Sequence, residues 1–380
     1  MSSAKIVVDL GFGDSGKGLA VDHIAAQDPD TSLVVRFSGG HQAGHTVVRD
    51  GRRHTFSNFG AGTLVGVPTY YSADTTLFPP AALMERADLG SIRPELVIHP
   101  LAMITTPYDV AYNRATERVN KHGSCGVGFG ATVERHQQGV VLYAKDLLSS
   151  WVVEQRMRSV DAYYRHKVSV ADSNVKRAYE EETSEFNVGG FVSICRTFVD
   201  SDEVAVAANG VLQSERPNLI FEGSQGIMLD QLHGLFPHVT RSDTTSKGAL
   251  AILRALGWND PVDIYYISRC YQTRHGNGPM SSTSSVTLHN NRDEANVHND
   301  YQGRFRVGEL DLELLNCALR TDAVYHDGID VRKHLVVTCL DQRPDFNLAL
   351  ALDGIDADFK SVSTSYGPDA DSVKTVELTC

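Results

Sequence analysis

The stretch Lys5-Ile-Val-Val-Asp-Leu10, followed by Gly11-Phe-Gly-Asp-Ser-Gly-Lys-Gly18, decides the fold of this chain. Its apolar, β-branched first half predicts a buried strand, and the glycines that follow end that strand abruptly. Apolar residues at helical spacing continue over residues 19–26, so the expected order is strand, glycine loop, helix. Such a loop directs backbone N–H groups and a helix N-terminus at one point, which favours a bound phosphate.

Two charged residues distinguish this loop from a simple phosphate cradle. Lys17 supplies a mobile positive charge, and Asp14 places a carboxylate beside it. A loop that only binds phosphate gains nothing from a carboxylate, whereas a loop that also holds Mg²⁺ or removes a proton does. We therefore predict both phosphate binding and chemistry at this loop.

The loop matches no common nucleotide-binding motif completely. Gly11, Gly13 and Gly16 fit the dinucleotide pattern G-x-G-x-x-G, but that loop relies on backbone amides and ordinarily carries no such lysine or aspartate. The Walker A pattern would require Ser or Thr where Gly18 stands. A strand-to-helix turn with incidental charges is the alternative at this point.

The composition indicates a globular protein with a large core and an acidic surface. The chain has 380 residues, 42% of them hydrophobic, which suffices for one large α/β domain or two smaller ones. A formal net charge of -12 argues against a nucleic-acid partner or an acidic membrane surface. Six cysteines without a C-x-x-C pair indicate reduced thiols, and no apolar run is long enough to span a membrane. We expect a cytoplasmic protein with no membrane partner.

A second strand also ends in a glycine loop that carries ionisable groups. Residues 32–37 predict the strand, and Ser38-Gly-Gly-His-Gln-Ala-Gly-His-Thr46 follows it. Because the carboxyl ends of parallel strands share one edge of a sheet, we expect the two loops to meet there. His45 is a candidate general acid or electrostatic stabiliser, with the Gly44 carbonyl beside it, although a lone histidine is more often structural.

The strand-then-glycine pattern recurs at residues 218–226, and further strands are expected at residues 262–267 and 334–341. Residues 149–188 are helix-rich and charged and carry no chemistry that can be assigned. We therefore predict one α/β domain over residues 1–380, built on a large, mostly parallel sheet flanked by helices, with a helical insertion at about residues 149–188. Within Gly303-Arg-Phe-Arg-Val-Gly308, Arg304 and Arg306 lie on one side of an extended segment and could grip a carboxylate or phosphate, although exposed arginine pairs are usually solvated.

Six segments along the chain form a recognisable set. They are Gly13-Asp-Ser-Gly-Lys-Gly18, Gly39-Gly-His-Gln-Ala-Gly-His-Thr46, Phe221-Glu-Gly-Ser-Gln-Gly-Ile-Met-Leu-Asp230, Phe236-Pro-His-Val-Thr240, Gly303-Arg-Phe-Arg306 and Ser365-Tyr-Gly-Pro368. In this order, and over nearly the whole chain, the set resembles the adenylosuccinate synthetase family. One segment alone would be weak evidence, whereas six in the family's order are strong evidence.

The resemblance implies a ligase that joins L-aspartate to C6 of IMP with GTP and Mg²⁺. The 6-oxo group is a poor leaving group and is therefore phosphorylated first. By resemblance, Asp14 removes the N1 proton while O6 attacks the γ-phosphate, His45 stabilises charge on that phosphate, and Lys17 holds the triphosphate. Asp14 and the Gly44 carbonyl would bind Mg²⁺.

The resemblance also implies which residues bind the substrates. For the triphosphate they are Gly13, Ser15, Gly16, Lys17, Gly18, Gly44, His45, Thr46, Asp341, Ser365 and Gly367. For the nucleotide and aspartate they are Ser15, Gln42, Ser124, Gln225, Thr240, Arg304 and Arg306. Asp341 and Ser365 would contact the guanine of GTP, and Arg306 would grip aspartate. Family members are commonly homodimers in which a basic residue crosses the interface, and Arg135 is the candidate for that residue.

Several departures from the family pattern bear on the substrate. They are Ser15 for Glu, Val127 for Arg, Phe305 and Val307 within the arginine run, and Cys339 for the Lys before Asp341. These changes resemble the viral branch of the family, which makes 2-amino-adenylosuccinate from dGMP. Guanine carries an N2 amino group that hypoxanthine lacks, and Ser15 would open room for it and offer an oxygen acceptor. We therefore favour dGMP or GMP over IMP, with GTP or ATP as the phosphoryl donor, in the host cytoplasm if the protein is viral.

Three alternatives stay open. The retained Asp14 is compatible with an ordinary enzyme that acts on IMP with GTP. A non-catalytic nucleotide-binding protein and a NAD-dependent dehydrogenase are the others. Asp14, Lys17, His45 and the two arginines Arg304 and Arg306 argue against the binder, which needs no base beside the phosphate lysine. Lys17 and Asp14 count against the dehydrogenase.

Overall fold

A large sheet organises the molecule, which is a computed structural model. The structure describes residues 2–121, 123–213, 216–282, 284, 286–290, 294, 296 and 301–378. In this part of the chain ten strands form one sheet in the order β16-β15-β14-β11-β1-β10-β2-β5-β7-β9. Every neighbouring pair in it is parallel except β15 with β16. The predicted large, mostly parallel sheet is therefore confirmed.

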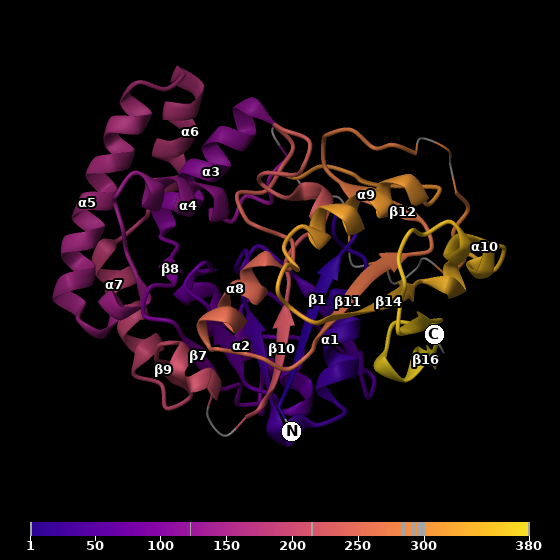
Figure 1. The fold of residues 1–380 in the computed structure, drawn as a ribbon. Helices are drawn as coiled ribbons and strands as arrows, with labels where there is room; N and C mark the ends of the chain where they lie inside the picture. The colour runs from indigo at the N-terminus through magenta and orange to yellow at the C-terminus, as the bar shows by residue number, and fades with distance from the viewer. Residues whose placement is uncertain are drawn as a thin grey trace.

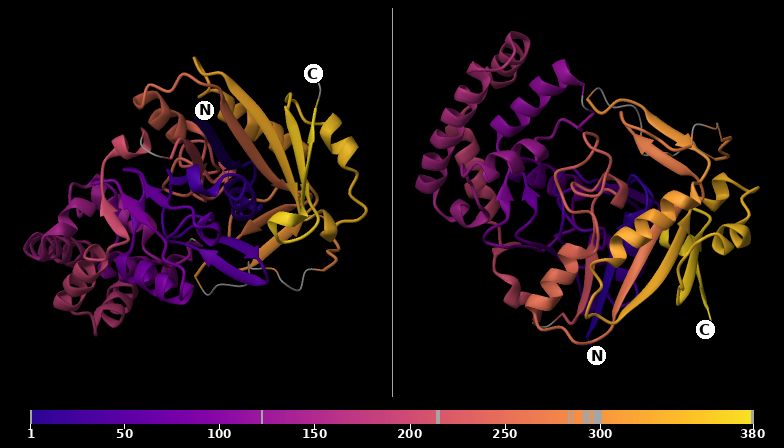
Figure 2. Two further views of the ribbon diagram at one scale, coloured as in Figure 1. Left: turned by 90° about the horizontal axis from the view of Figure 1, so that it is seen from below. Right: turned by 45° about the horizontal axis from the view of Figure 1, so that its top comes forward.

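The strands of this sheet are β1 (Ser3–Asp9), β2 (Ser32–Arg36), β5 (Thr69–Tyr71), β7 (Leu96–Ile98), β9 (Val204–Val206), β10 (Asn218–Glu222), β11 (Val262–Arg269), β14 (Val331–Thr338), β15 (Ser361–Ser365) and β16 (Val373–Glu377). Three short pairs lie outside it: β3 (His45–Arg49) with β4 (Arg52–Phe56), β6 (Thr76–Leu77) with β8 (Met103–Ile104), and β12 (Gln272–His275) with β13 (Phe305–Gly308). Figure 2 shows the β12–β13 pair standing apart from the main sheet, across from a group of helices.

Helices cover both faces of the sheet because side chains alternate along its strands. In β1, Val7 packs into one core together with Val21 of α1 (Lys17–Ala25). Ile6 and Val8 point the other way, into a core that they share with Leu250 of α8 (Lys247–Ala255) and with α9 (Leu312–Ala323). Burying such a side chain contributes roughly 1.5–3 kcal/mol, so β1 is held firmly from both sides. The remaining helices are α2 (Pro79–Leu89) and α10 (Leu348–Asp353) on the sheet, and α3 to α7 beside it.

The helical group beside the sheet consists of α3 (Pro107–Asn120), α4 (Phe129–Gln137), α5 (Ser150–Ser169), α6 (Ser173–Thr183) and α7 (Val188–Val199). It occupies the magenta side of Figure 1. The helices α5 and α6 fall in the predicted helix-rich stretch, and α7 continues it to Val199. Among the described residues, no helix combines the length and apolar character needed to cross a membrane.

A buried ion pair joins α3 to α4 and bears on the prediction made for Arg135. Arg135 is fully buried, and its guanidinium donates to both oxygens of Asp109, at 2.8 and 3.0 Å. Tyr164 of α5 donates to the same carboxylate at 2.6 Å, and Arg135 also donates to the carbonyls of Val140 and Ile104. Because Arg135 is buried and bonded within its own chain, this structure gives no support to the prediction that it reaches across to a partner subunit.

Candidate functional site

A cavity of about 760 Å³ lies at the carboxyl ends of the central strands. The loops that follow β1, β2, β10, β11 and β14 all contribute to its wall. Its volume is in the usual range for small-molecule sites, and its position is the one where open α/β sheets bind ligands. The two glycine loops therefore meet at one edge of the sheet, as their positions after parallel strands predict.

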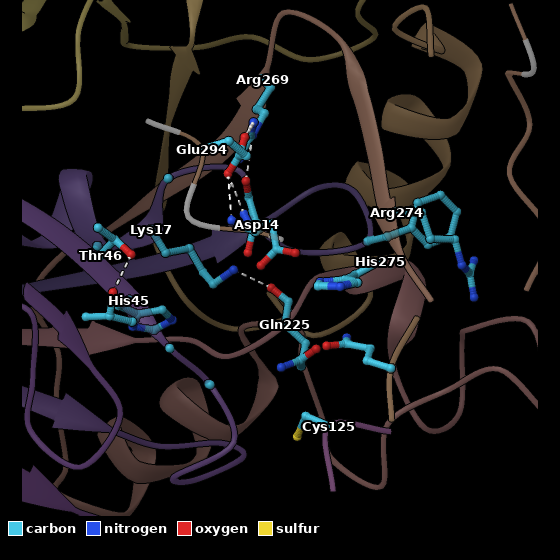
Figure 3. A pocket seen from close by; sticks show the side chains of 18 of the residues that line it. Asp14, Lys17, His45, Thr46, Cys125, Gln225, Arg269, Arg274, His275 and Glu294 are labelled. Carbon is cyan, nitrogen blue, oxygen red and sulfur yellow. Dashed lines mark hydrogen bonds and ion pairs between the residues drawn. The ribbon is translucent and has the colours of Figure 1, made fainter. Parts of the chain in front are cut away.

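The last residue of β1 shapes the first loop. The buried Asp9 carboxylate accepts the N–H of Gly11 at 2.9 Å and that of Ser15 at 3.1 Å, and it pairs with Lys17 at 3.2 Å. Lys17 also donates to the Gln225 carbonyl at 2.5 Å, as Figure 3 shows. An ammonium has three donors, so one remains for a ligand.

The loop after β10 presses directly on the first loop. A Cβ on Gly226 would lie 2.3 Å from the Gly11 carbonyl oxygen, so only glycine fits there. Gln225, next to it, has a φ of 55° and lines the cavity. The close approach explains how residues more than two hundred positions apart form one wall.

Asp14 presents a carboxylate to the cavity. Its side chain accepts no hydrogen bond from the described part of the chain, whereas its carbonyl accepts one from Arg269 at 2.7 Å. Figure 3 shows Asp14 close to Lys17 and His275. Burial raises the pKa of Asp14 above its usual value, and the neighbouring Lys17 and Arg269 only partly oppose this. A carboxylate in this state is a stronger proton acceptor than an ordinary aspartate.

His45 is held by a buried carboxylate. Its Nδ1 lies 2.7 Å from Glu222 Oε1, and both side chains are buried. Its Nε2 has no hydrogen-bond partner among the described residues, and His45 lines the cavity. Burial lowers the pKa of His45, although Glu222 opposes that shift. The proton therefore sits on Nδ1, towards Glu222, and Nε2 is left for a ligand.

Loop 123–128, which connects α3 to α4, is fastened to α3. The Glu117 carboxylate accepts the N–H groups of Gly123 and Ser124, and Asn113 donates to Ser124 Oγ at 2.7 Å. His41 of the second glycine loop contacts the Val127 carbonyl at 2.9 Å. The fastening places Ser124 in the cavity wall next to the second glycine loop.

Most of the predicted site residues line the cavity. They are Asp14, Gly16, Lys17, Gly18, Gln42, Gly44, His45, Thr46, Ser124, Gln225, Thr240, Asp341 and Gly367. Six predicted residues are not part of the lining: Gly13, Ser15, Arg135, Arg304, Arg306 and Ser365. Ser365 lies behind the wall and donates to the carbonyl of Gly367, at 2.7 Å.

The position of Ser15 does not support its predicted contact with a substrate amino group. Ser15 is buried, and its hydroxyl donates to the Gly13 carbonyl at 3.3 Å rather than facing the cavity. The predicted pair of arginines, Arg304 and Arg306, does not face the cavity. Arg304 is exposed to solvent and is not part of the lining. Arg306 lies behind the wall, where it donates to the carbonyls of Gly276 and Gly278 at 2.7 and 2.9 Å.

Sequence reasoning missed the residues at the end of β11 and in the segment that follows it. Arg269, Tyr271, Arg274 and His275 line the cavity, and Arg269 pairs with Glu294 at 2.7 Å. The strand-end rule that located His45 would also have located Arg269, because β11 ends at that residue. No comparable signal marks Glu294, which lies far from any expected strand end.

The donor set suits a magnesium ion that is held mainly by substrate. Among the described residues, no three or more His, Cys, Asp or Glu side chains gather in a metal-binding group. Asp14 offers two carboxylate oxygens, and Gly44 offers a backbone carbonyl in the same cavity wall. Mg²⁺ prefers oxygen ligands and commonly takes only one or two carboxylates, with phosphates and water completing its shell.

Fold and site together define an α/β protein with a ligand-sized cavity at the carboxyl edge of its sheet, where two glycine loops meet. A family model described as Adenylosuccinate synthetase matches residues 6–343. The chain therefore belongs to the adenylosuccinate synthetase family, whose members are carbon–nitrogen ligases.

Two curated relatives illustrate the sequence similarity. The adenylosuccinate synthetase of Methylococcus capsulatus is 31% identical over 292 residues, which cover 74% of this chain and 65% of that one. An adenylosuccinate synthetase of Xanthomonas oryzae pv. oryzae is 27% identical over 383 residues, covering 97% of this chain and 84% of that one. The chain thus spans just under two thirds of the first relative's length.

Two solved structures share the fold. The fully ligated adenylosuccinate synthetase of Plasmodium falciparum superposes with a TM-score of 0.65 at 17% identity, covering 99% of this chain and 87% of that chain. The succinoaminodeoxyadenylate synthetase PurZ of cyanophage S-2L, bound to dGMP and dATP, superposes with a TM-score of 0.63 at 17% identity. The match covers 98% of this chain and 95% of that chain.

Proposed function

We propose that the protein phosphorylates the 6-oxo group of dGMP or GMP with GTP or ATP and then joins L-aspartate at C6. The products are 2-amino-(deoxy)adenylosuccinate, a nucleoside diphosphate and phosphate. One observation carries the proposal: the Asp14 carboxylate, free of hydrogen bonds from the described residues, shares a cavity with Lys17 and with the unpartnered Nε2 of His45. A protein that only binds nucleotides needs no base there.

In the first step Asp14 accepts the N1 proton of the purine, and the electron pair moves to O6. O6 then bonds to the γ-phosphorus, and the bond to the leaving nucleoside diphosphate breaks. Lys17 and the amides of the first loop hold the phosphates in line, and a proton gained at His45 Nε2 would be stabilised through the ring by Glu222. The raised pKa of Asp14 suits it to this proton transfer.

In the second step the aspartate amine bonds to C6, the C6–O6 bond breaks, and phosphate leaves with the oxygen while one amine proton is released. By the family resemblance Arg306 is the proposed aspartate-binding residue, and it would have to exchange its bonds to the Gly276 and Gly278 carbonyls for the substrate carboxylate. Asp14 and Gly44 would hold Mg²⁺, which would neutralise charge on the phosphates when bound. The protein is expected to act in the cytoplasm as a homodimer, as family members commonly do.

Two observations support a 2-amino purine as substrate. The residue beside Asp14 is the short Ser15, whose hydroxyl is turned onto Gly13, so no long side chain from this position enters the cavity. The structural neighbour from cyanophage S-2L is bound to dGMP and dATP. The second candidate substrate is IMP, with GTP as donor, because the curated relatives carry the ordinary synthetase name.

Phosphate release from the purified protein tests the proposal. The protein receives L-aspartate and Mg²⁺ with dGMP, GMP or IMP, each paired with GTP or ATP, and omission of aspartate is the control. Aspartate-dependent turnover with dGMP or GMP but not IMP is the expected result. Turnover with IMP alone would instead make the protein an ordinary adenylosuccinate synthetase, and no turnover with any pair would leave a non-catalytic nucleotide-binding protein.

A further inference from the structure

Among the described residues, five lysine and arginine side chains line the cavity, and the known hydrogen bonds occupy their donors to different extents. They are Lys17, Arg53, Arg241, Arg269 and Arg274. Lys17 is bound to a carboxylate and a carbonyl, and Arg269 to a carbonyl, a hydroxyl and a carboxylate. Arg274 donates to three backbone carbonyls. Most hydrogen-bond donors of these three residues are therefore occupied by other residues of the cavity wall.

Arg241 has fewer of its donors occupied by protein groups. Among the described residues its ion-pair partner is Glu134, with Nη2 at 3.5 Å from Oε2, and half of its side chain is exposed. Glu134 is shared, because Lys167 also contacts this carboxylate. A guanidinium carries five N–H donors, so most of those on Arg241 are available to a ligand in the cavity.

Arg241 lies against the N-terminus of α4. Its Cδ is 3.6 Å from the position that a Cβ on Gly130 would take, and Gly130 is the second residue of that helix. The first amides of a helix have no acceptor within the helix, and the first turn of α4 contains no acidic residue to accept from them. Phe129 and Gly130 both line the cavity, so the positive end of α4 and the guanidinium face the same space.

Neutral donors gather at the same place. The hydroxyls of Ser124 and Thr240 line the cavity, and so does Gln42, whose side-chain amide nitrogen and oxygen are buried with no partner among the described residues. The loops that carry these residues are linked, because the Gly39 N–H donates to Ser242 Oγ at 2.9 Å and His41 contacts the 123–128 loop. An amide left unsatisfied in this way is costly unless a ligand completes its hydrogen bonds.

We infer that Arg241 binds the 5′-phosphate of the nucleoside monophosphate, from within the same chain. The inference rests on the proposed function, which requires a monophosphate in this cavity in addition to the triphosphate at Lys17. A phosphate suits the site better than the aspartate carboxylates do, since helix amides, two hydroxyls and a forked guanidinium together satisfy its three terminal oxygens. Arg135, the residue predicted for a basic contact from a partner, is fully buried inside the helical group and bonded to Asp109.

Calorimetric titration of Arg241→Met with dGMP and IMP, and with deoxyguanosine and inosine, tests the inference. Loss of a charge-assisted hydrogen bond predicts that Kd for the monophosphates rises about tenfold or more, while Kd for the nucleosides stays unchanged. Glu134→Gln is the matched control, because it breaks the same ion pair and leaves the guanidinium free; its Kd for dGMP should not rise. Arg165→Met, an exposed arginine on α5 outside the cavity lining, controls for loss of charge alone.

Three outcomes would overturn the inference. Equal weakening by Arg241→Met and Glu134→Gln would mean that the ion pair only stabilises the loop. If Arg241→Met weakens the binding of monophosphates and nucleosides equally, Arg241 does not contact the phosphate. The same conclusion would follow if this variant left Kd for dGMP unchanged and raised KM for aspartate. Arg241→Lys, which keeps the charge without the fork, should fall between wild type and Arg241→Met. Binding needs no turnover, so failure of the ligase proposal would show separately in the phosphate-release assay.

Discussion

Replacing Arg135 by methionine is expected to destabilise the protein without altering its substrate binding. The substitution leaves the Asp109 carboxylate buried with Tyr164 and the α3 N-terminus as its remaining donors. It also removes the donors from two buried carbonyls, of Val140 and Ile104. Arg135, Asp109 and Tyr164 pack α3, α4 and α5 together, and none of these three side chains lines the cavity.

The magnitude follows from the burial of the pair. Removing one partner of a fully buried ion pair costs about 3–5 kcal/mol, because the other charge loses its compensation. For a chain of 380 residues the unfolding entropy is about 0.8 kcal/mol/K, so Tm should fall by about 4–6 °C.

The loss should also depend on pH. Burial alone would raise the pKa of Asp109, but Arg135, Tyr164 and Thr106 hold it below its usual value in the folded protein. The stability from this carboxylate is therefore present above its unfolded pKa and is lost as pH falls through the folded pKa. In Arg135→Met the Asp109 pKa rises, and the difference in stability between the two proteins should shrink on acidification.

Urea unfolding followed by circular dichroism, at several pH values, measures the loss. The double variant Asp109→Asn/Arg135→Met should recover part of the stability, because no buried charge remains. Arg158→Met, an exposed arginine on α5, is the control and should leave unfolding unchanged. A variant with wild-type stability and a raised KM for the monophosphate would refute the reasoning and return Arg135 to a substrate site.

Three further predictions concern the chemistry. Asp14→Asn should lower kcat for phosphate release by about 10²–10⁴-fold while triphosphate binding measured by calorimetry is retained; near-normal turnover would exclude Asp14 as the base. Because burial raises the Asp14 pKa above 3.8, kcat/KM should decline on acidification at a higher pH than an ordinary aspartate would give, and a profile flat down to pH 4 would argue against this. Glu222→Gln should lower kcat about tenfold or more with little change in KM, and ¹⁵N NMR of labelled histidine should show a changed His45 tautomer; an unaltered His45 spectrum would contradict the role given to Glu222.

Local sequence patterns predicted the elements of the site but not all of its contacts. The two glycine loops were predictable because each follows an apolar β-branched strand, and parallel strands end at one edge. The contacts of Arg135 and Arg306 within the chain were not predictable, since the groups that an arginine meets depend on residues distant in sequence. Asp109, which forms the buried ion pair with Arg135, cannot be told apart in the sequence from an ordinary helix-capping aspartate. Nor could the sequence predict that Glu222 is buried next to His45, because that contact forms only when the sheet is assembled.

The place of β10 in the sheet has a consequence for synthesis on the ribosome. β10 separates β1 from β2, and β11 flanks β1 on its other side, so β1 has no neighbouring strand in the main sheet until residues 218–222 have emerged. Because synthesis adds about 5–20 residues per second, both edges of β1 stay unpaired for on the order of ten seconds or more. Unpaired apolar strand edges invite association with other chains. Nascent chains that stop before Asn218 should therefore depend on chaperones and retain no affinity for nucleotides.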